Sequence, residues 1–216
     1  MREHAGGRRG EGPRIVADAL RSAIIKGELS PNERLVEADL VAQYGVGRAA
    51  VRSALLELEK EGLIEREQSR GARVRSITVG EAVEIAEARM VNEALCAAKA
   101  AQRATDEEIA ELGQIVAEMR RLHSAGDLLG YSELNHTLHQ RIRQYSRHST
   151  AASIVEQLRN QSVRQNFRIA LLPGRTAVSL REHEAIVDAI AERDSSAAET
   201  AMQAHLRSVI EALQQL

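Results

Sequence analysis

Apolar residues recur at three- and four-residue steps along most of this chain, the spacing that brings side chains to one face of a helix. In the first third of the chain the pattern predicts three helices, within residues 15–29, 36–46 and 48–62. In each case the repeat stops at a glycine, which is a common helix terminator: Gly27, Gly45 and Gly62.

The third of these helices has two different faces. Its apolar stripe consists of residues at core spacing: Val51, Ala54, Leu55 and Leu58. Arg48 and Arg52 lie beside that stripe in the first turn. The helix is followed by "LIERE" and "ARVRSI", runs in which apolar and charged residues tend to alternate, joined by "QSRG". This arrangement is typical of a small hairpin. Three helices and a hairpin predict a winged helix-turn-helix over residues 13–76.

From Thr78 onward the pattern is wholly helical. Six amphipathic helices are expected, over residues 79–103, 106–124, 127–146, 150–171, 180–193 and 196–215. Four sequences of the capping-box type open helical runs: Thr78–Glu81, Thr105–Glu108, Ser179–Glu182 and Ser196–Glu199. Because the connections are short, neighbouring helices should be antiparallel. The expected fold is therefore mainly α, with an antiparallel six-helix bundle over residues 79–216 behind the winged helix.

Composition narrows the class of protein. No apolar run approaches the length of a membrane-spanning helix, so a membrane location is not expected. A single cysteine, Cys96, excludes an internal disulfide and suits a reducing cytoplasm. Residues 1–12 are polar and rich in Gly and Arg, and we expect them to form a disordered arm. The scarcity of aromatic residues leaves little surface on which single-stranded nucleic acid could stack.

Charge is unevenly distributed, although the net charge is only −2. Residues 1–78 contain 14 Lys and Arg against 12 Asp and Glu, whereas residues 79–216 contain 15 against 19. The positive charge gathers around the predicted third helix and hairpin, at Arg48, Arg52, Arg66, Arg70, Arg73 and Arg75. This distribution favours a polyanionic partner for the N-terminal region.

Arg48 and Arg52 are the candidate DNA-contacting residues. In a helix-turn-helix the start of the second helix enters the major groove, where arginine can donate two hydrogen bonds to guanine O6 and N7. Arg70 lies at the predicted hairpin tip, and Gly71 would let the backbone approach phosphate or the minor groove closely. The alternative is a solvated helix face in an ordinary helical domain. The hairpin and the clustered charge favour DNA.

Polar residues interrupt the apolar faces of the expected bundle at helical spacing. His183 and His205 each share a face with apolar neighbours three or four residues away, and Asn135 lies one turn before His139 on another such face. Buried polar groups need partners, and a divalent cation satisfies several at once. The alternative is a set of hydrogen-bonded core histidines without a metal.

The N-terminal motifs resemble a known family. "IIKGELSPNERLVEADL" leads into "GVGRAAVRSALLELEKEGLIE" and closes with "RGARV", which is similar to the winged-helix domain of GntR-type transcription regulators over residues 14–76. The resemblance implies that Arg48 and Arg52 occupy DNA-contacting positions and that Arg70 and Gly71 form the wing tip. The chain departs from the family at Gly47, where Ser or Thr is usual. A side-chain cap and a phosphate contact should therefore be missing.

The C-terminal motifs "EARMVNEALCAAKA", "LNHTLHQ", "EHEAIVDAI" and "AMQAHL" resemble the FCD domain, the ligand-sensing helical domain of the FadR-like GntR subfamily, over roughly 80–215. The resemblance implies that the metal-binding positions are Asn135, His139, His183 and His205. It also implies that Arg89 anchors the carboxylate of an effector. The family commonly has Asp at position 135. Imidazole-rich ligation favours zinc or nickel over magnesium.

Together these features predict a cytoplasmic bacterial transcription regulator, a repressor that binds operator DNA as a homodimer. Its helical domain would bind a metal and a small carboxylate metabolite. The alternative class is a metal-dependent enzyme acting on a carboxylic acid, since three histidines and an oxygen ligand also suit an open catalytic ion. Glu93 is the one candidate for a general base, and its spacing of one helical turn from Arg89 favours an ion pair instead.

Overall fold

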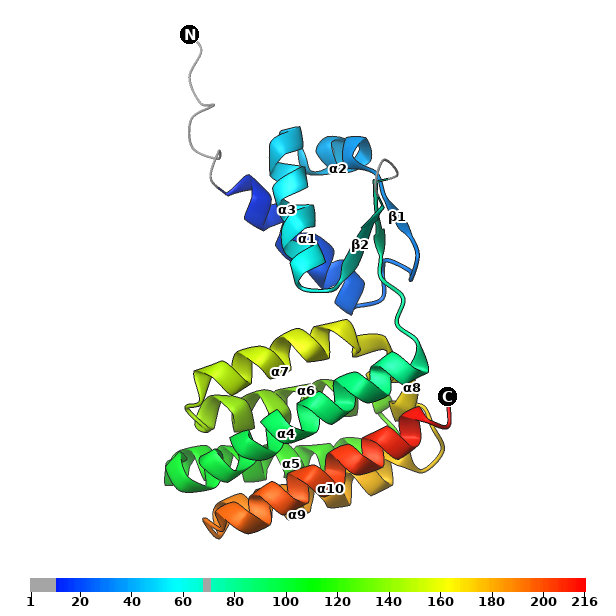
Figure 1. Ribbon diagram of the computed structural model, residues 1–216. Helices are drawn as coiled ribbons and strands as arrows, with labels where there is room; N and C mark the ends of the chain where they lie inside the picture. Colours follow the sequence, from blue (N-terminus) through cyan, green and yellow to red (C-terminus); the bar gives the residue numbers. More distant parts are fainter. Residues whose placement is uncertain (1–10, 68–70) are drawn as a thin grey trace. The chain divides into compact units, whose positions relative to one another are not determined.

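The computed structural model describes residues 11–67 and 71–216. The chain divides into two units, residues 1–77 and 78–216, which Figure 1 shows as a small mixed unit and a larger all-helical one. Each unit has a hydrophobic core of its own, so the apolar faces of its helices are buried within that unit. No helix in the described residues is long and apolar enough to cross a membrane.

The N-terminal unit is a winged helix-turn-helix, as the sequence predicts. Its helices are α1 (Gly12–Ile25), α2 (Glu37–Tyr44) and α3 (Arg48–Lys60), and its strands are β1 (Arg34–Leu35), β2 (Ile64–Glu67) and β3 (Gly71–Val74). Strand β3 is central and pairs antiparallel with both β1 and β2. The four apolar residues of the predicted α3 stripe are all buried in this core. Gly45 ends α2 in the left-handed conformation with φ 63°, which turns the chain toward α3.

Strand β1 is an addition to the expected hairpin. It has only two residues, too few to display an alternating pattern in the sequence. Arg34 lies opposite Arg73 and Leu35 opposite Ala72, and Leu35 is buried. A disordered arm is expected from the sequence over residues 1–12. Residues 1–10 lie outside the described residues, and Gly12 already belongs to α1.

Seven helices form the C-terminal unit, whose backbone is described throughout. They are α4 (Val79–Arg103), α5 (Asp106–Ala125), α6 (Leu128–Tyr145), α7 (Ser149–Gln161), α8 (Val163–Ala170), α9 (Arg175–Ala191) and α10 (Ser195–Leu213). In Figure 1, α4 runs beside α10 along much of its length. The buried face of α4 is rich in alanine, including Ala97 and Ala101, and small side chains allow close approach of the two helices. Helix α4 also packs against α6, α7 and α9, which brings the candidate ligand residues together.

The helix expected over residues 150–171 is two helices, so the bundle contains one more helix than the six predicted. Ser162 leaves the helical conformation, with φ −110° and ψ 14°. Its hydroxyl donates to the carbonyl oxygens of Leu158 and Arg159, at 3.4 and 3.5 Å. A serine that bonds the preceding turn competes with the helical ladder. No Gly or Pro marks this break, so the apolar pattern runs across it.

Helix starts also differ from two of the expected capping boxes. Thr78 and Thr105 do cap α4 and α5. Ser179, in contrast, is buried inside α9, which begins at Arg175 directly after Gly174. Helix α10 is capped by Asp194, whose carboxylate accepts hydrogen bonds from the backbone N–H groups of Ser196 and Ala197. Aspartate is as good an N-cap as serine, and here it stands earlier in the chain.

Candidate functional site

The N-terminal end of α3 presents Arg48 and Arg52 to solvent, one helical turn apart. Both side chains are exposed, while the opposite face of the helix is buried in the core. Gly47 is the N-cap residue and provides no side-chain cap, as the sequence indicates. The start of the helix, with its partial positive charge, is therefore not covered by a side chain of its own.

Arg52 has a partner within the protein that the sequence pattern did not indicate. Its Nε donates to Glu37 Oε2 at 2.9 Å, and Glu37 lies in the first turn of α2. The Arg52 side chain is largely exposed, so this ion pair contributes little to stability and can be exchanged for another anion at small cost. The contact holds the Arg52 side chain in a defined orientation near the N-terminus of α3.

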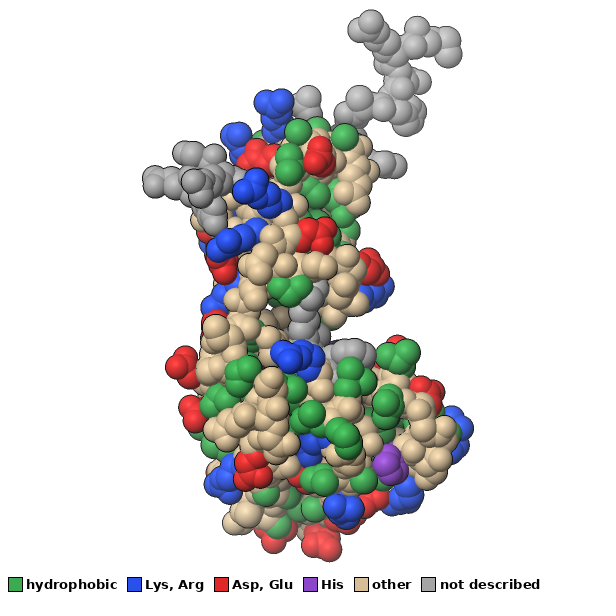
Figure 2. All heavy atoms as spheres, turned by 90° about the vertical axis from the view of Figure 1, so that its right-hand side faces the viewer, with side chains coloured by type: hydrophobic (Ala, Val, Ile, Leu, Met, Phe, Trp, Pro, Cys, Tyr) green, Lys and Arg blue, Asp and Glu red, His purple; other side chains and the backbone are tan. Residues whose placement is uncertain are grey.

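Strands β2 and β3 form the wing of this unit. Gly71 opens β3 with φ 89°, a left-handed conformation that side chains rarely adopt. Arg70, the expected tip residue, lies outside the described residues. Glu65 and Arg73 form an ion pair at 3.0 Å between opposed positions of β2 and β3. Figure 2 shows Lys and Arg side chains standing out on this unit with acidic side chains between them.

Three buried histidines meet in the C-terminal unit. His139 comes from α6, His183 from α9 and His205 from α10. One ligand atom from each lies within 4.8 Å of the others. His139 Nε2 and His183 Nε2 are 3.2 Å apart. The structure therefore brings together three of the four predicted metal-binding side chains as possible ligands of one ion.

Each histidine is held through its other ring nitrogen. His139 Nδ1 faces Glu93 Oε2 at 2.7 Å, and His205 Nδ1 faces Glu182 Oε2 at 2.8 Å. His183 Nδ1 lies 3.5 Å from the Ser179 hydroxyl oxygen. When Nδ1 donates to a carboxylate, the lone pair resides on Nε2, the tautomer that a metal requires.

The electrostatics keep the rings of His139 and His183 neutral. Burial lowers the pKa of His139 to about 3, although Glu93 opposes the shift. Burial, and the neighbouring His205 and His139, lower the pKa of His183 well below its ordinary value. Burial alone would raise the pKa of Glu182, but hydrogen bonds from His205 and Ser208 lower it to about 2. Neutral imidazoles oriented by carboxylates are competent metal ligands.

Asn135 supplies an independent indication of a missing partner. Its Oδ1 atom is buried and has no hydrogen-bond partner in the structure. It lies one helical turn before His139 on α6, so both project from the same face. Two nitrogens bound to one tetrahedral zinc at about 2.0–2.1 Å lie about 3.3 Å apart. The 3.2 Å separation of the His139 and His183 nitrogens fits such an ion.

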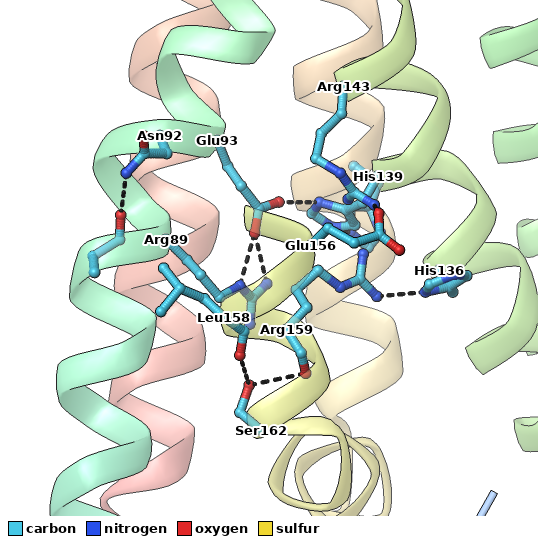
Figure 3. Close-up of polar contacts among 12 residues, drawn as sticks. Arg89, Asn92, Glu93, His136, His139, Arg143, Glu156, Leu158, Arg159 and Ser162 are labelled. Atoms are coloured by element: carbon cyan, nitrogen blue, oxygen red, sulfur yellow. Dashed lines mark hydrogen bonds and ion pairs between the residues drawn. The ribbon is translucent and has the colours of Figure 1, made fainter. Parts of the chain in front are cut away.

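Arg89, the expected effector anchor, is buried on α4 and paired with Glu93. Its Nη2 lies 2.7 Å from Glu93 Oε1, and its Nε donates to the same oxygen at 2.9 Å (Figure 3). Burial alone would raise the pKa of Glu93, but Arg89 and His139 hold it well below the ordinary value. One carboxylate therefore joins the expected anchor to a metal ligand.

Two further arginines lie in this region, the buried Arg143 and the half-buried Arg159, and sequence reasoning missed both (Figure 3). Arg159 of α7 donates from Nη2 to His136 Nδ1 at 2.8 Å, and Arg143 of α6 lies 3.3 Å from Glu156. Arg143 stands one turn after His139, and that spacing is the signal that could have found it. No such spacing relates Arg159 to the histidines, because it belongs to another helix.

Two family models cover most of the chain. Residues 84–208 match the model described as the FCD domain, and residues 14–74 match the model described as bacterial regulatory proteins of the gntR family. The chain is a GntR-family transcription regulator with an FCD domain. The family identity makes this protein a DNA-binding regulator, with the winged helix as its DNA-binding unit.

Curated relatives agree with this assignment. The HTH-type transcriptional repressor RspR of Escherichia coli (strain K12) is 27% identical over 197 residues, covering 91% of this GntR regulator and 86% of RspR. The HTH-type transcriptional regulator LutR of Bacillus subtilis (strain 168) is 26% identical over 211 residues, covering 88% and 95%.

Solved structures share the fold of the regulator. E. coli McbR/YncC superimposes with a TM-score of 0.78 at 19% identity, covering 94% of this chain and 97% of that one. A GntR regulator from Rhodococcus sp. RHA1 superimposes with a TM-score of 0.75 at 23% identity, with the same coverage of 94% and 97%. At these identities the likeness establishes the arrangement of helices and leaves the ligand to be argued from the side chains.

Proposed function

We propose that the protein is a cytoplasmic repressor whose binding to operator DNA is controlled by a small carboxylate, bound at a metal ion in the FCD domain. One observation carries the proposal. Three buried histidines, each with a polar neighbour at Nδ1, converge beside the unpartnered oxygen of Asn135. Such a set of donors has a buried lone pair on every member, and a divalent cation is the simplest group that satisfies all of them.

The donor set favours zinc or nickel. His139, His183 and His205 would hold the ion through imidazole nitrogen, with Asn135 as the oxygen ligand. Imidazole suits these metals better than magnesium, which prefers oxygen and water. When bound, the ion supplies a buried positive charge that attracts an anion.

The same charge argues for a carboxylate ligand. Three imidazoles and an amide are neutral, so they compensate none of the ion's charge. Glu93 and Glu182, the acidic groups beside the histidines, are already paired with Arg89 and Arg175. A buried cation needs a counter-charge, and a carboxylate brought by the effector would provide it. The guanidinium of Arg89 offers the forked donors that carboxylates accept.

Operator binding is proposed to involve a homodimer. A single winged helix offers few base contacts, and paired half-sites on a palindrome give useful affinity. Helix α4 carries two exposed apolar side chains one turn apart, Val91 at 67% exposure and Leu95 at 37%. Exposed apolar side chains that share a helix face favour a protein partner, and we propose a second copy of this chain.

The enzyme alternative is less well supported by the site. Glu93 was its candidate general base, but both carboxylate oxygens are engaged, one by Arg89 and one by His139. A general base must be free to accept a proton from substrate. The positions of these groups favour a role in holding the metal ligand in place.

Metal analysis of the purified full-length protein tests the proposal. We expect about one zinc or nickel ion per chain after purification without added metal. Binding to an operator selected from random duplexes should respond to a carboxylic acid in the metal-loaded protein and lose that response after chelation. Restoring the metal should restore the response. A protein that contains no metal, or one that responds unchanged after chelation, would contradict the proposal and leave the histidines as core residues.

A further inference from the structure

Three buried polar side-chain atoms in the described residues have no hydrogen-bond partner, and all belong to side chains around His139. One is the Asn135 oxygen already assigned to the metal. The other two are the Nη1 atoms of Arg143 and Arg159. These are donors rather than acceptors, so a cation cannot satisfy them. An unpartnered buried guanidinium nitrogen is costly and needs an acceptor.

Arg159 forms no ion pair with a carboxylate among the described residues. Its Nη2 donates to His136 Nδ1, which is neutral when it accepts (Figure 3). Burial, and repulsion from Arg89, lower the pKa of Arg159 to about 9, and the attraction of Glu93 and Glu156 offsets only part of that shift. Glu93 is itself engaged by Arg89. The positive charge of Arg159, whose Nη1 atom is buried, is therefore left without a direct counter-charge.

Arg143 is only weakly compensated. Its Nη2 lies 3.3 Å from Glu156, whose side chain is more than half exposed to solvent, while Nη1 has no acceptor. Figure 3 shows Arg143 and Arg159 approaching each other from α6 and α7. Two guanidinium groups that come together with unpartnered donors form a binding site for an anionic group.

The position of this anion site follows from the helix. Asn135, His139 and Arg143 are four residues apart in succession on α6, so they project from one face in order. The metal end of that face offers an oxygen acceptor, and the other end offers guanidinium donors. Because helical side chains lean toward the N-terminus, the Arg143 side chain reaches back toward His139, so one ligand on this face could meet both the ion and the guanidinium groups.

We infer that the effector carries a second acidic group, bound by Arg143 and Arg159, in addition to the carboxylate that the metal attracts. The effector class is therefore a short dicarboxylate. This inference rests on the proposed function, because it takes the metal as the site of the first carboxylate. The second acidic group would let the protein distinguish a dicarboxylate from a monocarboxylate of similar length.

Calorimetric titration of the zinc-loaded full-length protein tests it with matched pairs of acids. Succinate is compared with butyrate, and glutarate with valerate, since each pair differs by one carboxylate in place of a methyl group. We expect the dicarboxylate of at least one pair to bind at least about tenfold more tightly than its partner. Arg159→Gln should abolish that preference, and Arg159→Lys should retain part of it because the charge remains.

Arg121→Gln is the matched control, since Arg121 is an exposed arginine on α5 paired only locally with Glu118. It should leave the preference unchanged. Equal affinity within both pairs, no binding of any probe to zinc-loaded protein, or a preference that survives Arg159→Gln would each overturn the inference. In those cases retained zinc would leave the metal site standing. Failure to retain zinc at all would instead count against the proposed function itself.

Discussion

Glu93 Oε2 lies 2.7 Å from Nδ1 of His139, and the other oxygen of the same carboxylate is occupied by Arg89. Because all three groups are buried, none can change its partner without leaving another unsatisfied. The metal ligand and the expected effector anchor are therefore coupled through one side chain. A ligand that draws Arg89 toward itself would weaken the restraint on Glu93 and change the hydrogen bond that orients His139.

Replacing Glu93 with Gln should lower metal affinity by about tenfold to a hundredfold, the range seen when a group that orients a metal-bound histidine is removed. An amide cannot carry the negative charge that Arg89 requires, and it has one acceptor oxygen for the two donors, Arg89 and His139. Competition with a chromophoric chelator measures the affinity, and thermal melting checks folding. Glu118→Gln, a change at an exposed ion pair on α5, is the control. Unchanged metal affinity in a folded Glu93→Gln protein would show that Glu93 does not support the site.

His183→Ala should remove metal binding and effector response together. The ring contributes a buried ligand nitrogen, and the DNA-binding unit has a separate core that the change does not touch. Operator binding by the effector-free variant should therefore persist. Metal content and gel-shift titration provide the two measurements. A variant that loses its metal but whose operator binding still responds to the effector would show that metal binding and effector response are not coupled.

Arg89→Gln should retain the metal and lose the effector. The substitution leaves His139, His183 and His205 in place and removes the charged fork that the effector carboxylate is expected to accept from. It also leaves Glu93 less well compensated, so a lower melting temperature is expected. Zinc stoichiometry and calorimetry with the effector distinguish the two functions. Undiminished effector affinity in this variant would exclude Arg89 as the anchor.

Arg48→Ala and Arg52→Ala should each weaken operator binding by about 1–3 kcal/mol if the arginine contacts a base with both donors. A base-contacting arginine should also relax preference at one operator position, whereas a phosphate contact should weaken all sequences alike. Fluorescence anisotropy over a set of single-base operator variants makes this distinction. Arg121→Ala, in the other unit, is the control. Full affinity in both folded variants would remove α3 from the DNA interface.

Sedimentation should show the full-length protein and residues 78–216 alone as dimers at micromolar concentration. Val91→Glu should shift both toward monomer, because it places a charge in the proposed apolar contact. Leu56→Glu makes the same change at an exposed apolar position of the DNA-binding unit and should leave the dimer intact. A monomeric wild-type chain, or a Val91→Glu variant that stays dimeric, would argue against α4 as the interface.

The sequence predicts those parts of the fold that depend on periodicity. The apolar stripe of α3, which includes Val51 and Leu55, can be recognised in the sequence because apolar residues recur at helical spacing among polar and charged ones. Features that depend on a single hydrogen bond leave no periodic signal. Ser162 divides one expected helix into two through its own side chain, and nothing in the apolar pattern marks it.

The candidate site shows the same division. His139, His183 and His205 could be selected because a histidine on an apolar face is conspicuous in the sequence. Arg159 could not, because its importance comes from lying opposite α6 with an unpartnered nitrogen, and that juxtaposition is set by tertiary packing. Glu182 was missed for a related reason. It stands next to His183 in the chain but accepts its hydrogen bond from His205 on another helix.

The succession of Asn135, His139 and Arg143 along α6 makes that helix intolerant of changes in length. Each residue of an α-helix advances the side-chain direction by about 100°. A single residue inserted between 135 and 143 would turn one end of the series away from the other, even if every side chain were retained and the helix stayed intact. Deletions there should be equally damaging, whereas the connection at Gly126, outside the series, can change length at little cost. In the divergence of this protein from its relatives, substitutions along the face can alter which acid is accepted, but α6 can gain or lose residues only at its ends.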